Sequence, residues 1–219
     1  MKVALVARYP VKSLRGESIE VIELDDRGVV GDRLWALRAD NGEIGSGLGA
    51  GRLPRLTEMS SKVLWGVHTV LQLPDGREFA TIDPKIDDAV SEFVGQSVTV
   101  VKETETPHFD ASPLHLITTS TLRWLGIDEA DWMRTRANVL VETEGDNRAE
   151  DDWIGRRIKI GTSEVEITGP AVRRVMSGQA QGEPPARPEL PADHDVTLGA
   201  YARVINPGVI GTGDPLLFR

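Results

Sequence analysis

Two adjacent arginines, Arg173 and Arg174, follow the Gly-Pro pair at 169–170 in an otherwise acidic chain. Guanidinium groups bind phosphate and carboxylate groups through several hydrogen bonds at once, so this pair indicates a site for one small anion. The alternative is that Arg174 points to solvent and binds nothing. Both interpretations stay open from the residues alone.

A second candidate for anion binding is the run Thr118, Thr119 and Ser120, which precedes a short helical pattern at 122–125. Backbone amides at a helix start and nearby hydroxyls can donate hydrogen bonds to one anion. The run is also typical of an ordinary hydroxyl cap, which needs no ligand.

Two further arginines, Arg134 and Arg136, precede an apolar strand pattern. Burial of either would favour an anion site, because a charge buried alone is costly. The glycine-rich stretch 45–55 suits either an anion nest or a mobile loop. It lacks the Gly-Lys-Ser/Thr of a phosphate-binding loop, which favours the plain loop.

Catalytic candidates are few, and the chain has no cysteine. This absence excludes disulfides, thiolate metal sites and cysteine nucleophiles. The histidines have no metal-ligand spacing, and we predict no metal site. His108 and Asp110 are a candidate acid and base pair. His115 is another candidate, although a histidine in an apolar strand is more often a hydrogen-bonded core residue.

Composition excludes several classes of protein. The 219 residues carry a formal net charge of −9, which disfavours nucleic acid as a partner because phosphate backbones need clustered positive charge. No apolar stretch approaches the roughly 20 residues of a membrane span, and the first residues do not make a secretory signal. We therefore expect a soluble, cytoplasmic protein with a small anionic ligand.

Many short strands must position these residues. Apolar patterns bounded by turn residues predict strands at 2–8, 18–24, 33–40, 67–73, 76–80, 97–103, 114–118, 137–143, 153–161 and 163–169. Apolar residues spaced as on one helix face predict a helix at 83–94, starting behind Asp83-Pro84 and ended by Gly95. Turn residues predict hairpins at Pro74-Asp75-Gly76 and at Gly161-Thr162. A mainly β, barrel-like protein with a few short helices follows. The proline-rich segment 177–195 is expected to be a surface excursion.

Several segments, in chain order, carry a family resemblance. They are YPVKSLRG (9–16), RGVVGDRLWAL (27–37), SPLHLITTSTLRWL (112–125), RANVLVE (136–142), EDDWIGRRIKIG (150–161) and LGAYARVINPGVIGTGDPL (198–216). Through them the chain resembles the MOSC family, the molybdenum cofactor sulfurase C-terminal domain, with its N-terminal β-barrel region. The resemblance implies a MOSC-type β-barrel fold, with the N-terminal region at 1–105 and the domain core at 106–219.

The resemblance also implies a positive pocket that holds a molybdenum cofactor, which is a pterin phosphate, or handles sulfur for it. Some relatives reduce N-hydroxylated compounds with electrons from a partner protein. Molybdenum ion binding, pyridoxal phosphate binding and catalytic activity are further implied properties. The residues implied to contact the cofactor, with the two adjacent arginines added, are Lys12, Ser13, Arg33, Thr118, Thr119, Ser120, Arg136, Asn138, Arg173 and Arg174.

The chain departs from the family at 170–174. The usual family pattern there is proline, cysteine, any residue, arginine, cysteine. This chain has Ala171 and Arg174 at the two cysteine positions, and Thr197 where some members have another cysteine. A thiolate is the soft ligand that binds molybdenum or carries a persulfide, and none of these residues replaces it. We therefore predict an anion site without thiolate ligation.

Three functions stay open. The protein binds the cofactor or its metal-free pterin non-covalently, as a carrier or a low-activity reductase. Alternatively, it is a repurposed metal-free enzyme for another small anion, with Lys12, Asp110 or His115 as acid and base. In the third, it is a non-catalytic accessory module that contacts a larger enzyme through 177–195.

Overall fold

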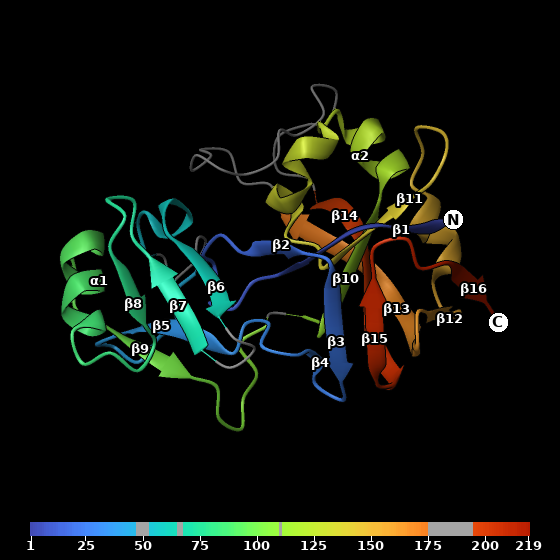
Figure 1. Ribbon diagram of the computed structural model, residues 1–219. Helices are drawn as coiled ribbons and strands as arrows, with labels where there is room; N and C mark the ends of the chain where they lie inside the picture. Colours follow the sequence, from blue (N-terminus) through green and yellow to red (C-terminus); the bar gives the residue numbers. More distant parts are fainter. Residues whose placement is uncertain (47–52, 65–67, 110, 175–194) are drawn as a thin grey trace. The chain divides into compact units, whose positions relative to one another are not determined.

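The computed structural model describes residues 1–46, 53–64, 68–109, 111–174 and 195–219, with 173–174 and 195–196 as backbone only. Strands dominate and the helices are short, so the predicted mainly β fold is confirmed (Figure 1). The chain divides into two units. Unit 1 comprises residues 1–7, 18–30 and 111–219, and unit 2 comprises residues 8–17 and 31–110.

Unit 1 is built on an eight-stranded sheet in the order β16, β12, β13, β14, β10, β11, β1, β2. These strands are β1 (Lys2–Arg8), β2 (Glu17–Ile19), β10 (Leu114–Thr118), β11 (Val139–Glu142), β12 (Arg157–Ile160), β13 (Ser163–Arg174), β14 (Asp195–Asn206) and β16 (Leu216–Phe218). The β10 and β11 strands pair in parallel, whereas β13 pairs with β12 and β14 in antiparallel fashion. The predicted hairpin at Gly161-Thr162 is thus confirmed.

A smaller sheet and short helices complete unit 1. The sheet joins β3 (Val21–Asp25), β4 (Gly28–Val29) and β15 (Gly208–Gly211), and the helices are α2 (Thr119–Leu125), η2 (Glu129–Thr135) and η3 (Ala149–Trp153). Side chains from both sheets form one apolar core, in which Val141, Ile158 and Ile210 are at most 1% exposed. Burial of such residues supplies the main free energy that holds the strands together.

The described part of unit 2 has two small sheets and one α-helix. One sheet pairs β5 (Trp35–Ala39) with β9 (Val98–Lys102), and the other is β6 (Ser60–Leu64), β7 (His68–Gln72) and β8 (Glu78–Ala80). The remaining elements are α1 (Ile86–Val94) and η1 (Leu56–Glu58). Val90 of α1 packs in the same core cluster as Leu71 of β7 and Met59. The predicted hairpin at 74–76 is confirmed by the antiparallel pairing of β7 and β8.

Helix α1 begins later than the predicted 83–94. Asp83 accepts hydrogen bonds from the amide of Lys85 through Oδ1 and from the amide of Ile86 through its carbonyl. This turn at Asp83 satisfies the first amides, and the helix starts after Lys85, at Ile86. Its predicted end is confirmed, since Gly95 has φ of 79° and donates its amide to the carbonyl of Ser91.

The predicted strand 18–24 is two strands. Its alternation is irregular, and the chain changes sheets at Glu20, between β2 and β3. The strand β6, which pairs with β7, was not predicted. Its first three residues, Ser60, Ser61 and Lys62, are polar and do not form the apolar pattern of a strand.

The two units interleave along the chain. Residues 1–7 belong to unit 1 because β1 pairs with β11, and residues 18–30 belong to it because β3 pairs with β15. The division into 1–105 and 106–219 therefore stays a prediction about family regions rather than about these units.

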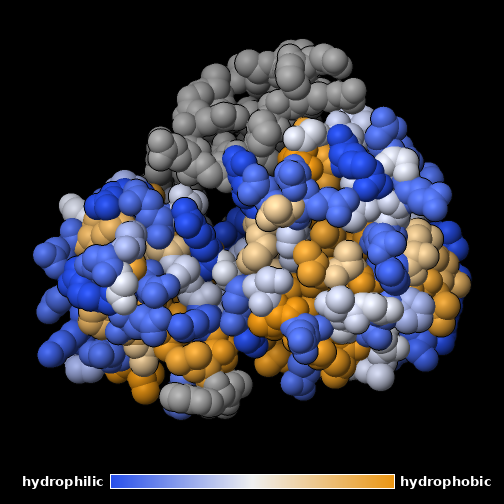
Figure 2. All heavy atoms as spheres, turned by 45° about the horizontal axis from the view of Figure 1, so that its top comes forward, coloured by the Kyte–Doolittle hydropathy of each residue, from blue (hydrophilic) through white to orange (hydrophobic). Residues whose placement is uncertain are grey.

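The surface is mixed in polarity. In the face drawn in Figure 2, hydrophilic side chains dominate and hydrophobic ones lie among them in both units. Within the described ranges, no helix has the length and apolar character of a membrane span.

Candidate functional site

Unit 2 joins the PVKS segment (10–13) to the GDR segment (31–33). The amide of Arg33 donates to the carbonyl of Tyr9 over 2.7 Å, and the amide of Tyr9 donates to Oδ1 of Asp32 over 2.7 Å. Nη1 of Arg33 donates to Oδ2 of Asp32. The Arg33 side chain is 14% exposed and that of Asp32 is 4% exposed. This nearly buried ion pair ties the two predicted segments together.

Lys12 is held at both ends. Its amide donates to the carbonyl of Trp35, and its Nζ donates to the carbonyl of His108, each over 2.8 Å. The first bond extends strand-like pairing from β5 to the PVKS segment, where Val11 forms a parallel bridge with Trp35. Three of the predicted contact residues, Lys12, Ser13 and Arg33, are therefore brought into one loop system.

Two residues of this loop system, Ser13 and Arg33, have strained backbone. The described non-glycine residues with positive φ are Ser13 (67°), Arg33 (49°), Arg55 (65°) and Arg136 (60°). Positive φ is costly for residues with a Cβ and persists where the surrounding structure requires it, which is often at functional sites. Three of these four were predicted from the sequence to contact a phosphate or pterin. The fourth, Arg55, forms a surface ion pair with Glu58.

The two arginines that precede β11 differ in their surroundings. The Arg134 side chain is 37% exposed, and its Nη1 lies 3.5 Å from Oδ2 of Asp131, with which it forms an ion pair. Arg136 is half-buried and ends η2 in a left-handed conformation, with its amide donating to the carbonyl of Met133 over 3.0 Å. Contact of Arg136 with an anion stays a prediction.

Asn138 and His115 form a buried bridge between β1, β10 and β11. The Asn138 side chain accepts from the amide of His115 through Oδ1 and donates to the carbonyl of Ala7 through Nδ2. The His115 ring bonds the carbonyl of Leu198 through Nε2. A carbonyl only accepts, so Nε2 carries the proton. This is the hydrogen-bonded core histidine that was the alternative to catalysis, and a catalytic role stays a prediction.

The hydroxyls after β10 form a chain of donors that ends on Glu150. Thr118 and Thr121 donate to its carboxyl oxygens over 2.7 Å, and Thr143 donates to Ser120 over 2.8 Å. The hydroxyl of Thr118 also lies 3.0 Å from that of Ser120 and 3.1 Å from that of Thr121. Glu150 is 0% exposed. These hydroxyl protons are therefore directed to protein acceptors.

The predicted hydroxyl cap is also present. Thr118 accepts the amide of Thr121 over 3.1 Å at the start of α2, and Thr119 donates to the carbonyl of Thr143 over 2.9 Å. The cap interpretation is thus confirmed, and contact of these residues with a cofactor stays a prediction. Glu150 itself was missed, because it stands in the acidic run Glu150-Asp151-Asp152 that is typical of an exposed segment.

Glu150 should make stability depend on pH. Burial raises the pKa of its carboxyl, opposed in part by the hydrogen bonds from Thr118 and Thr121. The folded protein therefore holds this proton to a higher pH than the unfolded chain does. The resulting stabilisation is complete below the ordinary glutamate pKa and is lost as the pH rises through the raised value.

We expect Glu150→Gln to weaken this pH dependence. Between pH 4 and pH 8, the wild type should lose more thermal stability than the variant, by on the order of 2–4 °C in Tm. Asp152→Asn, a neighbour that is exposed, serves as the charge-matched control. Equal slopes of Tm against pH in wild type and Glu150→Gln would contradict the expectation.

The positions of the two usual family cysteines, 171 and 174, lie on β13, and Thr197 lies on β14. Ala171 is 1% exposed and stands at an irregularity of the strand, since Pro170 pairs with Ala200 but Val172 pairs with Thr197. Such bulges re-aim side chains and are common beside functional sites. The side chains of Arg173 and Arg174 lie outside the described residues, as do Asp110 and residues 175–194.

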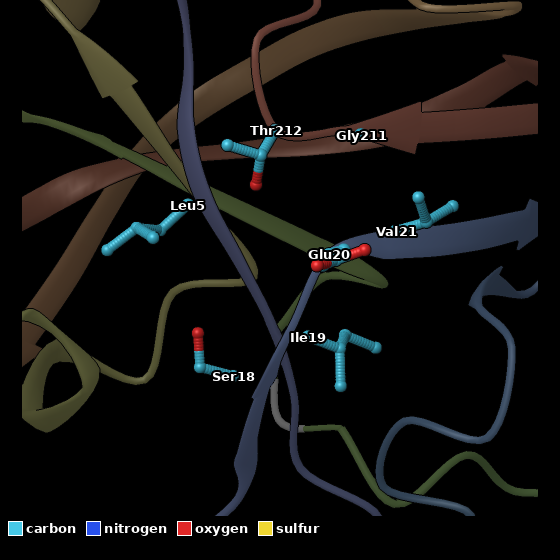
Figure 3. Close-up of a pocket in the computed structure, with 7 residues that line it drawn as sticks. All are labelled: Leu5, Ser18, Ile19, Glu20, Val21, Gly211 and Thr212. Atoms are coloured by element: carbon cyan, nitrogen blue, oxygen red, sulfur yellow. The ribbon is translucent and has the colours of Figure 1, made fainter.

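Unit 1 also carries an open groove of about 510 Å³. It is lined by Leu5 of β1, by Ser18 to Val21 and by Gly211 and Thr212 (Figure 3). Its lining is largely apolar and its charged residue is Glu20. A carboxylate repels an anion, and none of the predicted contact residues lines the groove, so it is a poor candidate for the anion site.

Two family models match the chain. One, described as the MOSC domain, matches residues 97–217, and the other, the MOSC N-terminal beta barrel domain, matches residues 1–113. This chain belongs to the MOSC family. Among solved structures, it is similar to the YuaD protein from Bacillus subtilis, with 14% identity and a TM-score of 0.46 over 98% of this chain and 93% of that one. No curated protein matches the chain.

Family membership confirms the resemblance read from the sequence, and with it the MOSC-type fold. The predicted residues are divided between the two units. Unit 2 holds Lys12, Ser13 and Arg33, and unit 1 holds the remaining described ones. The absence of cysteine distinguishes this MOSC protein from the usual pattern at 170–174.

Proposed function

We propose that this MOSC protein binds the molybdenum cofactor, or its metal-free pterin phosphate, non-covalently and without a cysteine ligand. The observation that carries the proposal is the positive φ of Ser13, Arg33 and Arg136. Strain of this kind has to be offset by the rest of the fold, and it falls on three residues that the family resemblance assigns to the ligand.

The donor set fits the phosphate and pterin part of this ligand. Lys12, Arg33 and Arg136 are all half-buried cations. A partly desolvated ammonium or guanidinium group binds a dianionic phosphate more strongly than an exposed one does. Lys12 offers a point charge, and the arginines offer planar donor sets that match phosphate or pterin edges.

The donor set does not fit thiolate ligation of the metal. The buried side chain at the family cysteine position is the methyl group of Ala171, which has no lone pair to offer. When bound, the cofactor supplies the redox centre that family relatives use on N-hydroxylated compounds. In this chain, we propose that the residues hold and orient its phosphate and pterin, as a carrier or as a weak reductase supplied by an electron-transfer partner.

The proposal is tested by removing two of these cations, one at a time. Lys12→Ala and Arg136→Ala should each lower the pterin that co-purifies from a cofactor-producing host by about tenfold, the loss expected for one charge-assisted hydrogen bond. The pterin is measured by fluorescence after oxidation, per mole of protein. Lys85→Ala, an exposed lysine at the start of α1, is the matched control. Pterin content equal to wild type in both variants would sink the proposal.

A further inference from the structure

We propose that Asp32 is a positioning residue, which holds Arg33 and the PVKS segment in the geometry that binds the anion. This inference rests on the proposed function and adds a residue that the sequence did not single out. Asp32 is itself acidic, so it has no direct role as an anion ligand.

The case begins with the two carboxyl oxygens of Asp32, which serve two different segments. Oδ1 accepts the amide of Tyr9 over 2.7 Å, and Oδ2 accepts Nη1 of Arg33. Tyr9 in turn accepts the amide of Arg33 over 2.7 Å. One buried carboxylate thus closes a ring of hydrogen bonds between residues 9 and 33.

The turn that Asp32 occupies needs such support. Gly31 has φ of 79° and Arg33 has φ of 49°, so positive φ occurs on both sides of Asp32. The guanidinium carbon of Arg33 also lies 5.1 Å from the centroid of the Tyr9 ring. Stacking and the ion pair together restrict the Arg33 side chain to one orientation.

A positioning role and a purely electrostatic role of Asp32 predict opposite changes in anion affinity when its charge is removed. A carboxylate beside Arg33 cancels much of its positive potential and by itself weakens anion binding. If Asp32 acted only through charge, Asp32→Asn would bind the anion more tightly. If Asp32 positions Arg33, the same variant binds the anion more weakly, because the asparagine Nδ2 faces Nη1 as a second donor and displaces it.

Two variants distinguish the hydrogen bond that Asp32 accepts from the Tyr9 amide from the one that it accepts from Arg33. Asp32→Asn keeps an acceptor for the amide of Tyr9, whereas Asp32→Ala removes both acceptors. We expect amide hydrogen exchange, followed by NMR, to speed up about tenfold or more at Tyr9 in Asp32→Ala and to stay near wild type at Tyr9 in Asp32→Asn. We expect co-purified pterin to fall about tenfold in both variants. Asp88→Asn, an exposed aspartate on α1, controls for the change in net charge.

The exchange measurement uses the protein without ligand, so it decides the inference even if wild type carries no pterin. Unchanged exchange at Tyr9 in Asp32→Ala would overturn the positioning role. So would a rise in pterin content in Asp32→Asn, because it would assign Asp32 a purely electrostatic effect. Absence of pterin from wild type, with the expected exchange pattern, would instead count against the proposed function alone.

Discussion

Replacing Arg33 with alanine is expected to lower the free energy of unfolding by about 3 kcal/mol, because it removes the ion pair that Arg33 forms with the nearly buried carboxylate of Asp32. The side chain of Asp32 is 4% exposed, and in the native protein it accepts from Nη1 of Arg33. Alanine and arginine both carry a Cβ, so the positive φ at position 33 disfavours them alike. Urea unfolding of wild type and variant at one pH measures the difference.

A double variant shows whether loss of this ion pair is the cause. Asp32→Asn in the Arg33→Ala background removes the buried negative charge and leaves an acceptor for the amide of Tyr9. The double variant should therefore be more stable than Arg33→Ala alone. A double variant that is less stable than the single one would mean that the ion pair does not dominate the energy of this turn.

The second large effect is expected from restoring the family cysteine. Ala171→Cys introduces a thiolate, the soft ligand that molybdenum prefers, at a buried position of β13. We expect the variant to retain at least about tenfold more molybdenum per chain after dialysis, a change that needs only about 1.4 kcal/mol of added binding energy. Elemental analysis of protein from a cofactor-producing host is the measurement.

Its control is a cysteine at the adjacent position. Val172 is 45% exposed, so Val172→Cys adds a thiol to the same strand at a solvent-facing site. Equal molybdenum in the two variants would show that the thiol acts non-specifically. No gain in either variant would contradict the assignment of Ala171 as the position of the missing ligand.

The sequence predicted those parts of the fold that depend on local residues. Pro74, Asp75 and Gly76 indicate their hairpin because turn backbone favours those residue types. Helix α1 ends as expected because Gly95 adopts positive φ without strain. The interleaving of the units was not predictable in this way, because it depends on the pairing of β1 with β11, two strands that are far apart in the sequence.

The site was predicted only in part, for a similar reason. Lys12, Ser13 and Arg33 were found through short motifs, which are local. Asp32 and Glu150 were not, because a carboxylate in sequence is normally a solvated surface group. Their importance comes from burial at 3% and 0% exposure, and burial depends on tertiary packing that no local pattern reports.

The most direct test of the central claim is the cofactor content of the wild-type protein. The protein is purified from a host that makes the molybdenum cofactor, and pterin and molybdenum are measured on the same sample. Our account predicts near-stoichiometric pterin, bound although the chain has no cysteine. Protein that carries neither pterin nor molybdenum would contradict the account and direct the search to other small anions.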